Sequence, residues 1–274
     1  MLNILLSFPY VDDGVIRAMG SAPDNVRILL DSGAFTAWKA GTEIDFDAYI
    51  AFLKDPPFPI WRYMTLDVVG DPTRTEANTK RLRDAGLNPI PIFTRGDSID
   101  RIDEMYLDSD LIALGGLVGT RGNTGFVRGV MRHIGDRRVH WLGFTRHQFL
   151  CYYRPYSVDA ANWQSAARYG SSYLYHGRGK MTQINRSDFH EKPSAETMTA
   201  IRRLGFDPKL FQHEQNWRGS RTNFAVRLCA SSYIRYMQDL ERQTGTRFFM
   251  SCGCEAGEIY LTLVFEEAQR LRCG

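Results

Sequence analysis

The segment Arg27-Ile28-Leu29-Leu30-Asp31-Ser32-Gly33 is a short apolar run that ends in a carboxylate and a glycine. A run of this kind, bounded by turn residues, is typical of a buried β-strand. Similar runs recur along the first two thirds of the chain and alternate with longer amphipathic stretches. This is the pattern of successive βα units around a parallel sheet, so the sequence predicts an α/β fold.

Eight segments have the strand pattern, which is the number that a closed, TIM-like (β/α)8 barrel requires. They are residues 3–7, 27–31, 61–67, 89–93, 111–115, 139–143, 156–159 and 172–176. Helices are expected between them, because each strand is followed by a stretch long enough to cross back over the sheet. These helices are residues 46–53, 72–85, 99–108, 124–133 and 160–168.

The pattern changes after residue 190, where helical periodicity replaces the alternation of strands and helices. Ser194 is a good N-cap for a helix that ends near Gly205, and longer helices are expected over 223–244 and 255–272. We therefore expect a catalytic barrel over residues 1–190 and a helical C-terminal appendage over 191–274, packed on the barrel.

Composition and charge describe an ordinary folded protein, with 43% hydrophobic and 24% charged residues. No apolar run approaches the roughly 18 residues that span a bilayer, and the first residues lack the basic start of a signal peptide. Five cysteines are an odd set for a disulfide framework. We expect a cytoplasmic protein without a membrane partner, in the host cytoplasm if a phage encodes it. Its net charge of +3 leaves any attraction for polyanions to local clusters of arginine and lysine.

Polar residues stand at the carboxyl ends of several expected strands, where the active sites of such barrels lie. Asp31, Asp67 and Asp159 each end an apolar run, and the pair Gly115-Gly116 ends another. Asp31 and Asp159 could also be simple turn or N-cap residues, and the glycines could serve only close packing. Two carboxylates in different environments are the standard equipment for cleaving a glycosidic bond, one as nucleophile and one as proton carrier.

A series of short motifs carries a family resemblance. In order they are Asp-Ser-Gly-Ala-Phe (31–35), Leu-Asp (66–67), Pro-Ile-Phe (91–93), Leu-Gly-Gly-Leu (114–117), His-Trp-Leu-Gly (140–143) and Ser-Val-Asp (157–159). Over roughly residues 27–190 the chain resembles the tRNA-guanine transglycosylase superfamily. Ala34 and the run Ser-Val-Asp-Ala-Ala-Asn-Trp (157–163) resemble most its DpdA-type branch, the phage and bacterial enzymes that insert 7-deazaguanine bases such as preQ0 into DNA.

The resemblance implies a pentosyltransferase that exchanges guanine in DNA for a 7-deazaguanine base, a modification suited to evading restriction. Asp159 would be the nucleophile that attacks C1′, and Asp31 the general acid and base. Asp67 would bind the N1 and amine edge of the base, and the amides of Gly115 and Gly116 its carbonyl edge. Ser32 and Phe93 complete the implied base-binding set. No cofactor is implied.

The chain also departs from this superfamily. Its tRNA enzymes hold a structural zinc with three cysteines and a histidine, whereas Cys252-Gly253-Cys254 supplies only part of such a motif. We therefore expect no metal, and zinc is disfavoured. Phe93-Thr94-Arg95-Gly96 stands where those enzymes have a Gln-Gly-Gly turn, so part of the base pocket must differ.

A guanine within a duplex must be flipped out, or presented in a single strand, before an enzyme reaches its C1′. Phosphate contacts would position that strand. Arg121, Arg146, His176, Arg178 and Lys180 are the expected nucleic-acid-binding residues, in loops after the fifth, sixth and eighth strands. His140 is expected to be buried within its strand.

Three alternatives remain open at this stage. The substrate could be tRNA instead of DNA, or the barrel could bind nucleic acid without catalysis. A metal-dependent hydrolase with Asp31, Asp67 and His176 as ligands is the third reading, although no paired-histidine motif supports it. The sequence does not reveal which 7-deazaguanine base is used or whether the chain forms a homo-oligomer.

Overall fold

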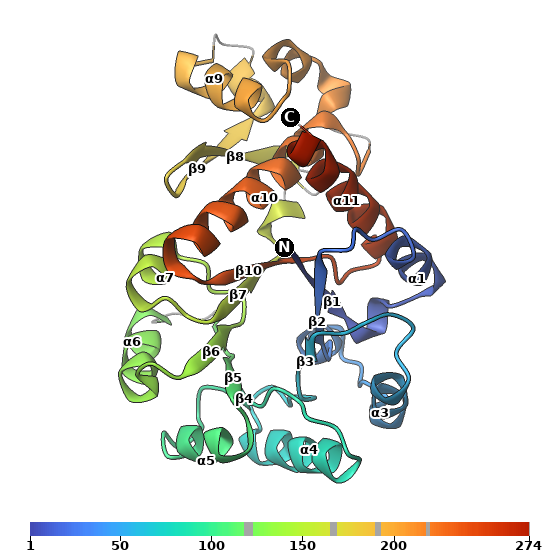
Figure 1. The fold of residues 1–274 in the computed structure, drawn as a ribbon, viewed down its shortest axis with the longest axis vertical. Helices are drawn as coiled ribbons and strands as arrows, with labels where there is room; N and C mark the ends of the chain where they lie inside the picture. Colours follow the sequence, from blue (N-terminus) through green and yellow to red (C-terminus); the bar gives the residue numbers. More distant parts are fainter. Residues whose placement is uncertain (118–122, 165–168, 190–192, 218–219, 274) are drawn as a thin grey trace.

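The computed structural model describes residues 1–117, 123–164, 169–189, 193–217 and 220–273 (Figure 1). Eight of the strands in this part of the chain form one parallel sheet, in the spatial order β3-β2-β1-β10-β7-β6-β5-β4. The strands are β1 Leu2–Ser7, β2 Val26–Asp31, β3 Arg62–Tyr63, β4 Ile92–Phe93, β5 Leu111–Leu114, β6 Arg138–Trp141, β7 Ser157–Ala160 and β10 Arg247–Ser251. The predicted α/β class with a parallel sheet is confirmed.

Helices surround this sheet on its outer face, except α9, which lies beside a separate pair of strands (Figure 1). They are α1 Asp13–Met19, α2 Ala34–Ala40, α3 Phe46–Lys54, α4 Pro72–Asp84, α5 Arg101–Asp108, α6 Asn123–Ile134, α7 His147–Tyr153, α9 Ala195–Arg203, α10 Phe224–Thr244 and α11 Gly257–Cys273. The larger hydrophobic core lies between these helices and the sheet. None of the described helices has the length and apolar character needed to cross a membrane.

The sheet is curled. This follows from a second, smaller core, which brings together residues from strands that are far apart in the sheet order. This inner cluster consists of Leu5, Leu29, Met64, Ile90, Ile92, Leu111, Ala113 and Phe249. Met64, just after β3, also forms an isolated parallel bridge with Ile90, just before β4. The inner cluster therefore fills the concave side of the sheet.

Local sequence signals explain where several helices begin. The side chains of Asp45, Asp71, Ser194 and Asn223 each accept a hydrogen bond from the backbone N–H three residues later, as N-caps do. The predicted helices over 46–53, 72–85 and 223–244 are confirmed with small shifts of their ends. Helices α1, α2 and α7 were not predicted, because each has only seven residues.

The prediction that residues 172–176 form the eighth strand of the barrel is wrong. This segment belongs to β8 Ser171–Gly177, which pairs antiparallel with β9 Lys180–Asn185 in a separate hairpin. The two residues between these strands, Arg178 and Gly179, have φ angles of 51° and 75°. Positive φ at both positions is what a type I′ hairpin turn requires, so the expected loop after residue 176 is a tight turn.

Helix α10 explains why the hairpin stays apart from the sheet. It packs against β8 on one side and against β10 on the other (Figure 1). The eighth place in the sheet belongs to β10, between β1 and β7. Residues 191–274, expected to be a helical appendage packed on the barrel, therefore supply a central strand of the sheet.

The expected helix over 160–168 also differs in the part that is described. Ala160 is the last residue of β7, and Asn162–Gln164 forms a single 3₁₀ turn. Trp163 and Gln164 in this turn both donate hydrogen bonds to the carbonyl of Ser251, at 2.8 and 2.7 Å. The turn is thus tied to the end of β10, while residues 165–168 lie outside the described residues.

Candidate active site

Three aspartates lie at the carboxyl end of the curled sheet. Asp31 is the last residue of β2, Asp159 lies in β7, and Asp67 follows β3. The negative charge of Asp159 acts on the pKa of Asp31, and that of Asp31 acts on the pKa of Asp67. The three carboxyl groups therefore form one electrostatic cluster, which we call the aspartate cluster.

Asp31 is held by two donors on one of its oxygens. The Ser7 hydroxyl donates to Oδ2 at 3.0 Å, and the Gly33 backbone N–H donates to the same atom at 2.9 Å. Ser7 and Asp31 are register partners on β1 and β2, so their side chains point to the same face. Burial raises the pKa of the Asp31 carboxyl, and the charge of Asp159 adds to this shift, against the opposing effect of the two donors.

Two glycines permit this arrangement. Gly33 has a φ of 83°, and a Cβ placed there would lie 2.4 Å from the ring of Pro9. Gly253, just after β10, would place a Cβ 2.6 Å from the backbone nitrogen of Ser7. Such distances exclude a side chain without movement of the backbone. The close packing of these glycines fixes Ser7 and Asp31 relative to each other.

Asp67 lies in a half-buried position beside Asp31. Burial, and then the charge of Asp31, raise its pKa to about 7. The Ser32 hydroxyl lies 3.5 Å from Asp67 Oδ1, which is a weak hydrogen bond at best. Helix α4 holds the backbone here, since the Asn78 side-chain amide donates to the carbonyl of Leu66 at 2.9 Å. A carboxyl group with this pKa exists in both protonation states near neutral pH.

Asp159 has a different environment. The Gly143 backbone N–H donates to its Oδ1 at 3.0 Å, and His140 Nε2 lies 3.2 Å from the same oxygen. His140 is fully buried, as predicted, and its Nδ1 lies 2.8 Å from the Ser157 hydroxyl. If that hydroxyl donates to Nδ1, Nε2 carries the proton and donates to Asp159.

The two oxygens of Asp159 are therefore not equivalent. Oδ1 has two partners, whereas Oδ2 accepts no hydrogen bond from the described residues. The side chain is oriented through one oxygen and leaves the other for a ligand. This asymmetry suits a nucleophile whose reacting atom must be accessible while its position is fixed.

The structure places two of the expected base-binding residues elsewhere. The ring of Phe93 belongs to the larger core outside the sheet, where it stacks on Phe126 of α6 at 6.3 Å. The backbone N–H of Gly115 donates to the carbonyl of Phe93 at 2.8 Å, so it belongs to the sheet ladder. A Cβ at Gly115 would lie 3.1 Å from the side chain of Ile92, which supports the close-packing interpretation of this glycine. Gly116 has a φ of 67°, and its carbonyl accepts a hydrogen bond from Arg95 at 3.4 Å.

Of the expected nucleic-acid-binding residues, some are exposed and others are engaged with neighbouring side chains. Arg146 and Arg178 are exposed, and Gly179, beside Arg178, lies against the ring of His147, beside Arg146. Lys180 is paired with Glu196 at 2.6 Å. The expectation that His176 contacts nucleic acid is not supported, because its side chain is buried and its Nε2 lies 2.8 Å from the Thr182 hydroxyl. Arg121 lies outside the described residues.

Sequence reasoning did not assign Ser7, Gly143, Ser157 or Gly253 to the site. Their contributions depend on strand register and on backbone approach, which the local sequence does not show. The spacing of Ser157 and Asp159, two residues apart on one strand, was the available signal that both side chains share a face. Within the described residues, no group of three or more histidine, cysteine, aspartate or glutamate side chains is arranged to hold a metal ion.

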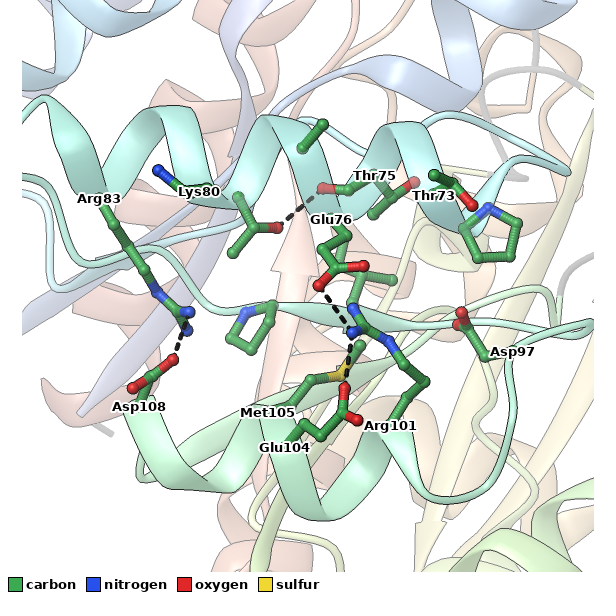
Figure 2. A pocket seen from close by; sticks show the side chains of 15 residues that line it. Thr73, Thr75, Glu76, Lys80, Arg83, Asp97, Arg101, Glu104, Met105 and Asp108 are labelled. Carbon is green, nitrogen blue, oxygen red and sulfur yellow. Dashed lines mark hydrogen bonds and ion pairs between the residues drawn. The ribbon is translucent and has the colours of Figure 1, made fainter.

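Figure 2 shows a cavity of about 480 Å³ between α4 and α5, on the outer side of the sheet. Five of its charged residues are engaged with one another: Arg101 pairs with Glu76 and Glu104, and Arg83 pairs with Asp108 (Figure 2). The Arg101–Glu76 and Arg83–Asp108 pairs join the two helices, and none of the three aspartates lines this cavity. A second cavity, of about 590 Å³, lies between α2 and α4 and includes Asp67 in its lining.

Comparisons of the chain with protein-family models, with curated proteins and with solved structures gave no match.

Proposed function

We propose that the protein is a DNA-guanine transglycosylase, which exchanges guanine for a 7-deazaguanine base through a covalent glycosyl-aspartate. The observation that carries this proposal is the contrast between Asp31 and Asp159 at one end of the sheet. One carboxyl group has a raised pKa, and the other is oriented through Oδ1 with Oδ2 open. Base exchange needs a proton carrier and a nucleophile, and these two environments suit those roles.

In the first half of the reaction, Asp159 Oδ2 attacks C1′ of the deoxyguanosine. A bond from this oxygen to C1′ forms while the bond from C1′ to N9 breaks, and the electron pair of that bond leaves with guanine. Asp31, in its protonated form, gives its proton to the departing base. Burial favours that form by raising the pKa of the Asp31 carboxyl.

In the second half, the deprotonated Asp31 accepts the N9 proton of the incoming base. N9 then attacks C1′, and the ester bond to Asp159 breaks with its electron pair returning to the carboxylate. Asp31 is protonated again, so the cycle closes without a redox cofactor or a nucleotide energy source. The donors from Gly143 and His140 stabilise the carboxylate that is released.

Asp67 is the proposed contact for the N1 and amine edge of both bases. Two N–H groups on this edge match the two oxygens of a carboxylate. With a pKa of about 7 in the free protein, Asp67 must lose its proton to accept both hydrogen bonds. Binding of the base therefore favours ionisation of Asp67, and base affinity should rise with pH up to about 7.

We also propose that the curled sheet closes into a complete (β/α)8 barrel. The Ile90 N–H donates to the Tyr63 carbonyl at 2.8 Å, and the Thr65 N–H donates to the Ile90 carbonyl at 3.0 Å. These bonds span the two edges of the sheet next to β3 and β4. Trp61, before β3, also stacks on Tyr156, before β7, at 6.2 Å between centroids, although three strands separate β3 from β7 in the sheet order.

The proposed polymer is DNA with its guanine flipped or unpaired, and Arg146 and Arg178 are the proposed phosphate contacts. Their common position beside the contact of His147 with Gly179 supports this assignment. We propose that the protein acts in the cytoplasm. The four cysteines described as free thiols, Cys151, Cys229, Cys252 and Cys254, are consistent with a reducing compartment.

The test is base exchange with a 7-deazaguanine precursor, read by mass spectrometry of the nucleosides released from DNA and, in parallel, from tRNA. We expect incorporation into DNA by the wild-type protein and none by Asp159→Ala. An Asp159→Ala protein treated with substrate should also fail to form the covalent adduct that denaturing gel electrophoresis detects for the wild type.

The two polymers separate the main alternatives. Incorporation into tRNA alone would move the substrate and retain the chemistry. Tight DNA binding without exchange, equal in wild type and Asp159→Ala, would instead indicate a binding protein and would overturn the proposed activity.

A further inference from the structure

Helix α2 presents its large side chains to solvent and its small ones to the core. Ala34 and Ala37 face inward, with 7% and 8% of their surface exposed, whereas Phe35 and Trp38 are 38% and 57% exposed. An amphipathic helix usually buries its aromatic residues, because they contribute the most hydrophobic stabilisation. The reversed pattern indicates that the aromatic side chains serve a contact outside the fold.

The two exposed rings form an organised pair. Phe35 and Trp38 lie one helical turn apart, with ring centroids 6.0 Å apart and ring planes inclined by only 28°. The Lys39 ammonium lies 4.4 Å from the centre of the Phe35 ring. The surface thus combines flat aromatic faces with a positive charge, and we call these three residues the aromatic platform.

The platform is fixed close to the aspartate cluster. Its helix starts at Gly33, two residues after Asp31, and the contact of Gly33 with Pro9 fixes the direction in which α2 leaves the sheet. Asp67 of the aspartate cluster and Trp38 of the platform both line the cavity of about 590 Å³. A ligand bound at Asp67 can therefore reach Trp38.

The charges around this cavity favour a base joined to phosphates over a free anion. Arg74 lines the cavity, and Lys39 lies over the Phe35 ring. Neither has a carboxylate partner among the described residues, whereas Arg81 is paired with Asp47. Glu43 and Asp71 lie on the same cavity wall, and Asp71 caps α4 by accepting from the Arg74 N–H. A nucleotide would suit this mixture of charges. Its neutral base would stack on Trp38, and its phosphates would lie near Lys39 and Arg74.

We propose that Phe35 and Trp38 stack on an unpaired nucleobase of the substrate strand, next to the nucleotide whose base is exchanged. The assignment of that neighbouring nucleotide rests on the proposed transglycosylase function. Every base has a π face, so stacking tolerates any sequence and adds affinity without reading it. The platform would hold the strand in its open form while the target guanine occupies the aspartate cluster.

The experiment measures binding of oligo(dT) and of an abasic strand of equal length. Neither strand contains guanine, so no exchange takes place. Stacking of one base predicts that the wild type binds oligo(dT) about tenfold more tightly than the abasic strand. Trp38→Leu, which keeps an apolar side chain without a ring, should bind both strands equally, and Trp38→Phe should retain most of the difference.

Tryptophan fluorescence gives a direct readout of the same contact. Trp141, Trp163 and Trp217 are fully buried and Trp61 is half-buried, so iodide quenches mainly Trp38. Oligo(dT) should protect Trp38 from iodide, and the abasic strand should not. Equal binding of the two strands by the wild type, or an undiminished preference in Trp38→Leu, would overturn the platform.

Two further outcomes distinguish this proposal from the proposed function. Preference for oligo(dT) through Trp38, without base exchange in any polymer, would support the platform and overturn the transglycosylase assignment. Exchange with an unchanged KM for single-stranded substrate in Trp38→Leu would do the reverse. A wild-type dimer that Trp38→Leu converts to a monomer, with no change in DNA binding, would assign the surface to self-association and overturn the platform.

Discussion

The two ends of the curled sheet have opposite chemistry. At the carboxyl end, Asp31, Asp67 and Asp159 gather with small residues, and Oδ2 of Asp159 accepts no hydrogen bond from the described part of the chain. At the amino end, Trp61 stacks on Tyr156 and on Phe249, with centroids 6.2 and 5.6 Å apart. Arginines cover these rings, since Arg27 lies over Trp61 and Arg247 over Tyr156, at 5.2 and 4.2 Å.

This difference separates stability from chemistry along one set of strands. Stacked aromatic rings with cations on their faces favour a packed, closed end. The crowded carboxylates at the other end lower the stability of the fold when they are ionised. Burial raises the pKa of Asp31 and of Asp67, which means that their ionisation is costly. The amino end thus stabilises a scaffold on which the carboxyl end can hold an unfavourable cluster of charges.

The largest effect is expected at the carboxyl end, on activity alone. Asp159→Asn replaces the nucleophilic oxygen while keeping the size of the side chain, so base exchange should fall by about 10⁴-fold or more. Its thermal unfolding should stay within a few degrees of the wild type. A variant that retains a tenth of the activity would remove Asp159 from the proposed role.

The next effect is expected at the amino end, on stability. Trp61→Ala removes the ring that joins Tyr156, Phe249 and Arg27, and should lower the free energy of unfolding by about 3 kcal/mol, measured by urea denaturation. Trp38→Ala is the control, because an exposed ring contributes little to folding. The folded Trp61→Ala protein should retain base exchange. Loss of activity as severe as in Asp159→Asn would show that the two ends are not separable.

The aspartate cluster predicts that the free energy of unfolding depends on pH. Asp67 has a pKa of about 7 when folded and near 3.9 when unfolded, so the folded state binds its proton more tightly. This favours folding below about pH 4, and the advantage is lost as the pH rises to about 7. Asp67→Asn cannot ionise and escapes this loss. The full shift corresponds to roughly 4 kcal/mol, and the partial exposure of Asp67 reduces the expected gain to about 2 kcal/mol at pH 8 relative to pH 4.

The measurement is chemical denaturation of wild type and Asp67→Asn at several pH values. Asp67→Ala also lacks the charge, so it should show the same pH dependence with a constant offset for its smaller side chain. A stability difference that is flat between pH 4 and pH 8 would contradict the raised pKa of Asp67.

Most of the sheet could be predicted from local sequence, but its last strand could not. Residues 172–176 and Arg247–Ser251 are both short apolar runs, and nothing local distinguishes a hairpin strand from one that inserts between β1 and β7. Pairing between β1 and β10 joins residues 246 positions apart, for example Ile4 with Met250. Such pairing depends on the packing of α10, which separates the two candidate segments.

The candidate site divides in the same way. The aspartates were found because strand ends in a parallel sheet share one edge. Phe93 was misplaced because a two-residue strand offers no alternation to read: Ile92 joins the inner cluster and Phe93 the outer core. Ser7 and His140 reach the aspartates through register, Ser7 beside Asp31 and His140 beside Ser157, which only the assembled sheet defines.

The smallest effect is expected from Ser7, whose hydroxyl donates to Asp31 Oδ2 at 3.0 Å. This bond favours the ionised carboxylate and opposes the effect of burial on its pKa. Ser7→Ala should therefore raise the pKa of Asp31 further, and shift the limb of the kcat/KM profile that Asp31 controls upward by about 0.5 to 1 pH unit, or roughly 1 kcal/mol. Ser157→Ala is the matched control, because that hydroxyl contacts His140 and acts on the side of Asp159. It should lower kcat without moving that limb. A profile that Ser7→Ala leaves in place would show that Asp31 is not the proton carrier, even if Asp159 remains the nucleophile.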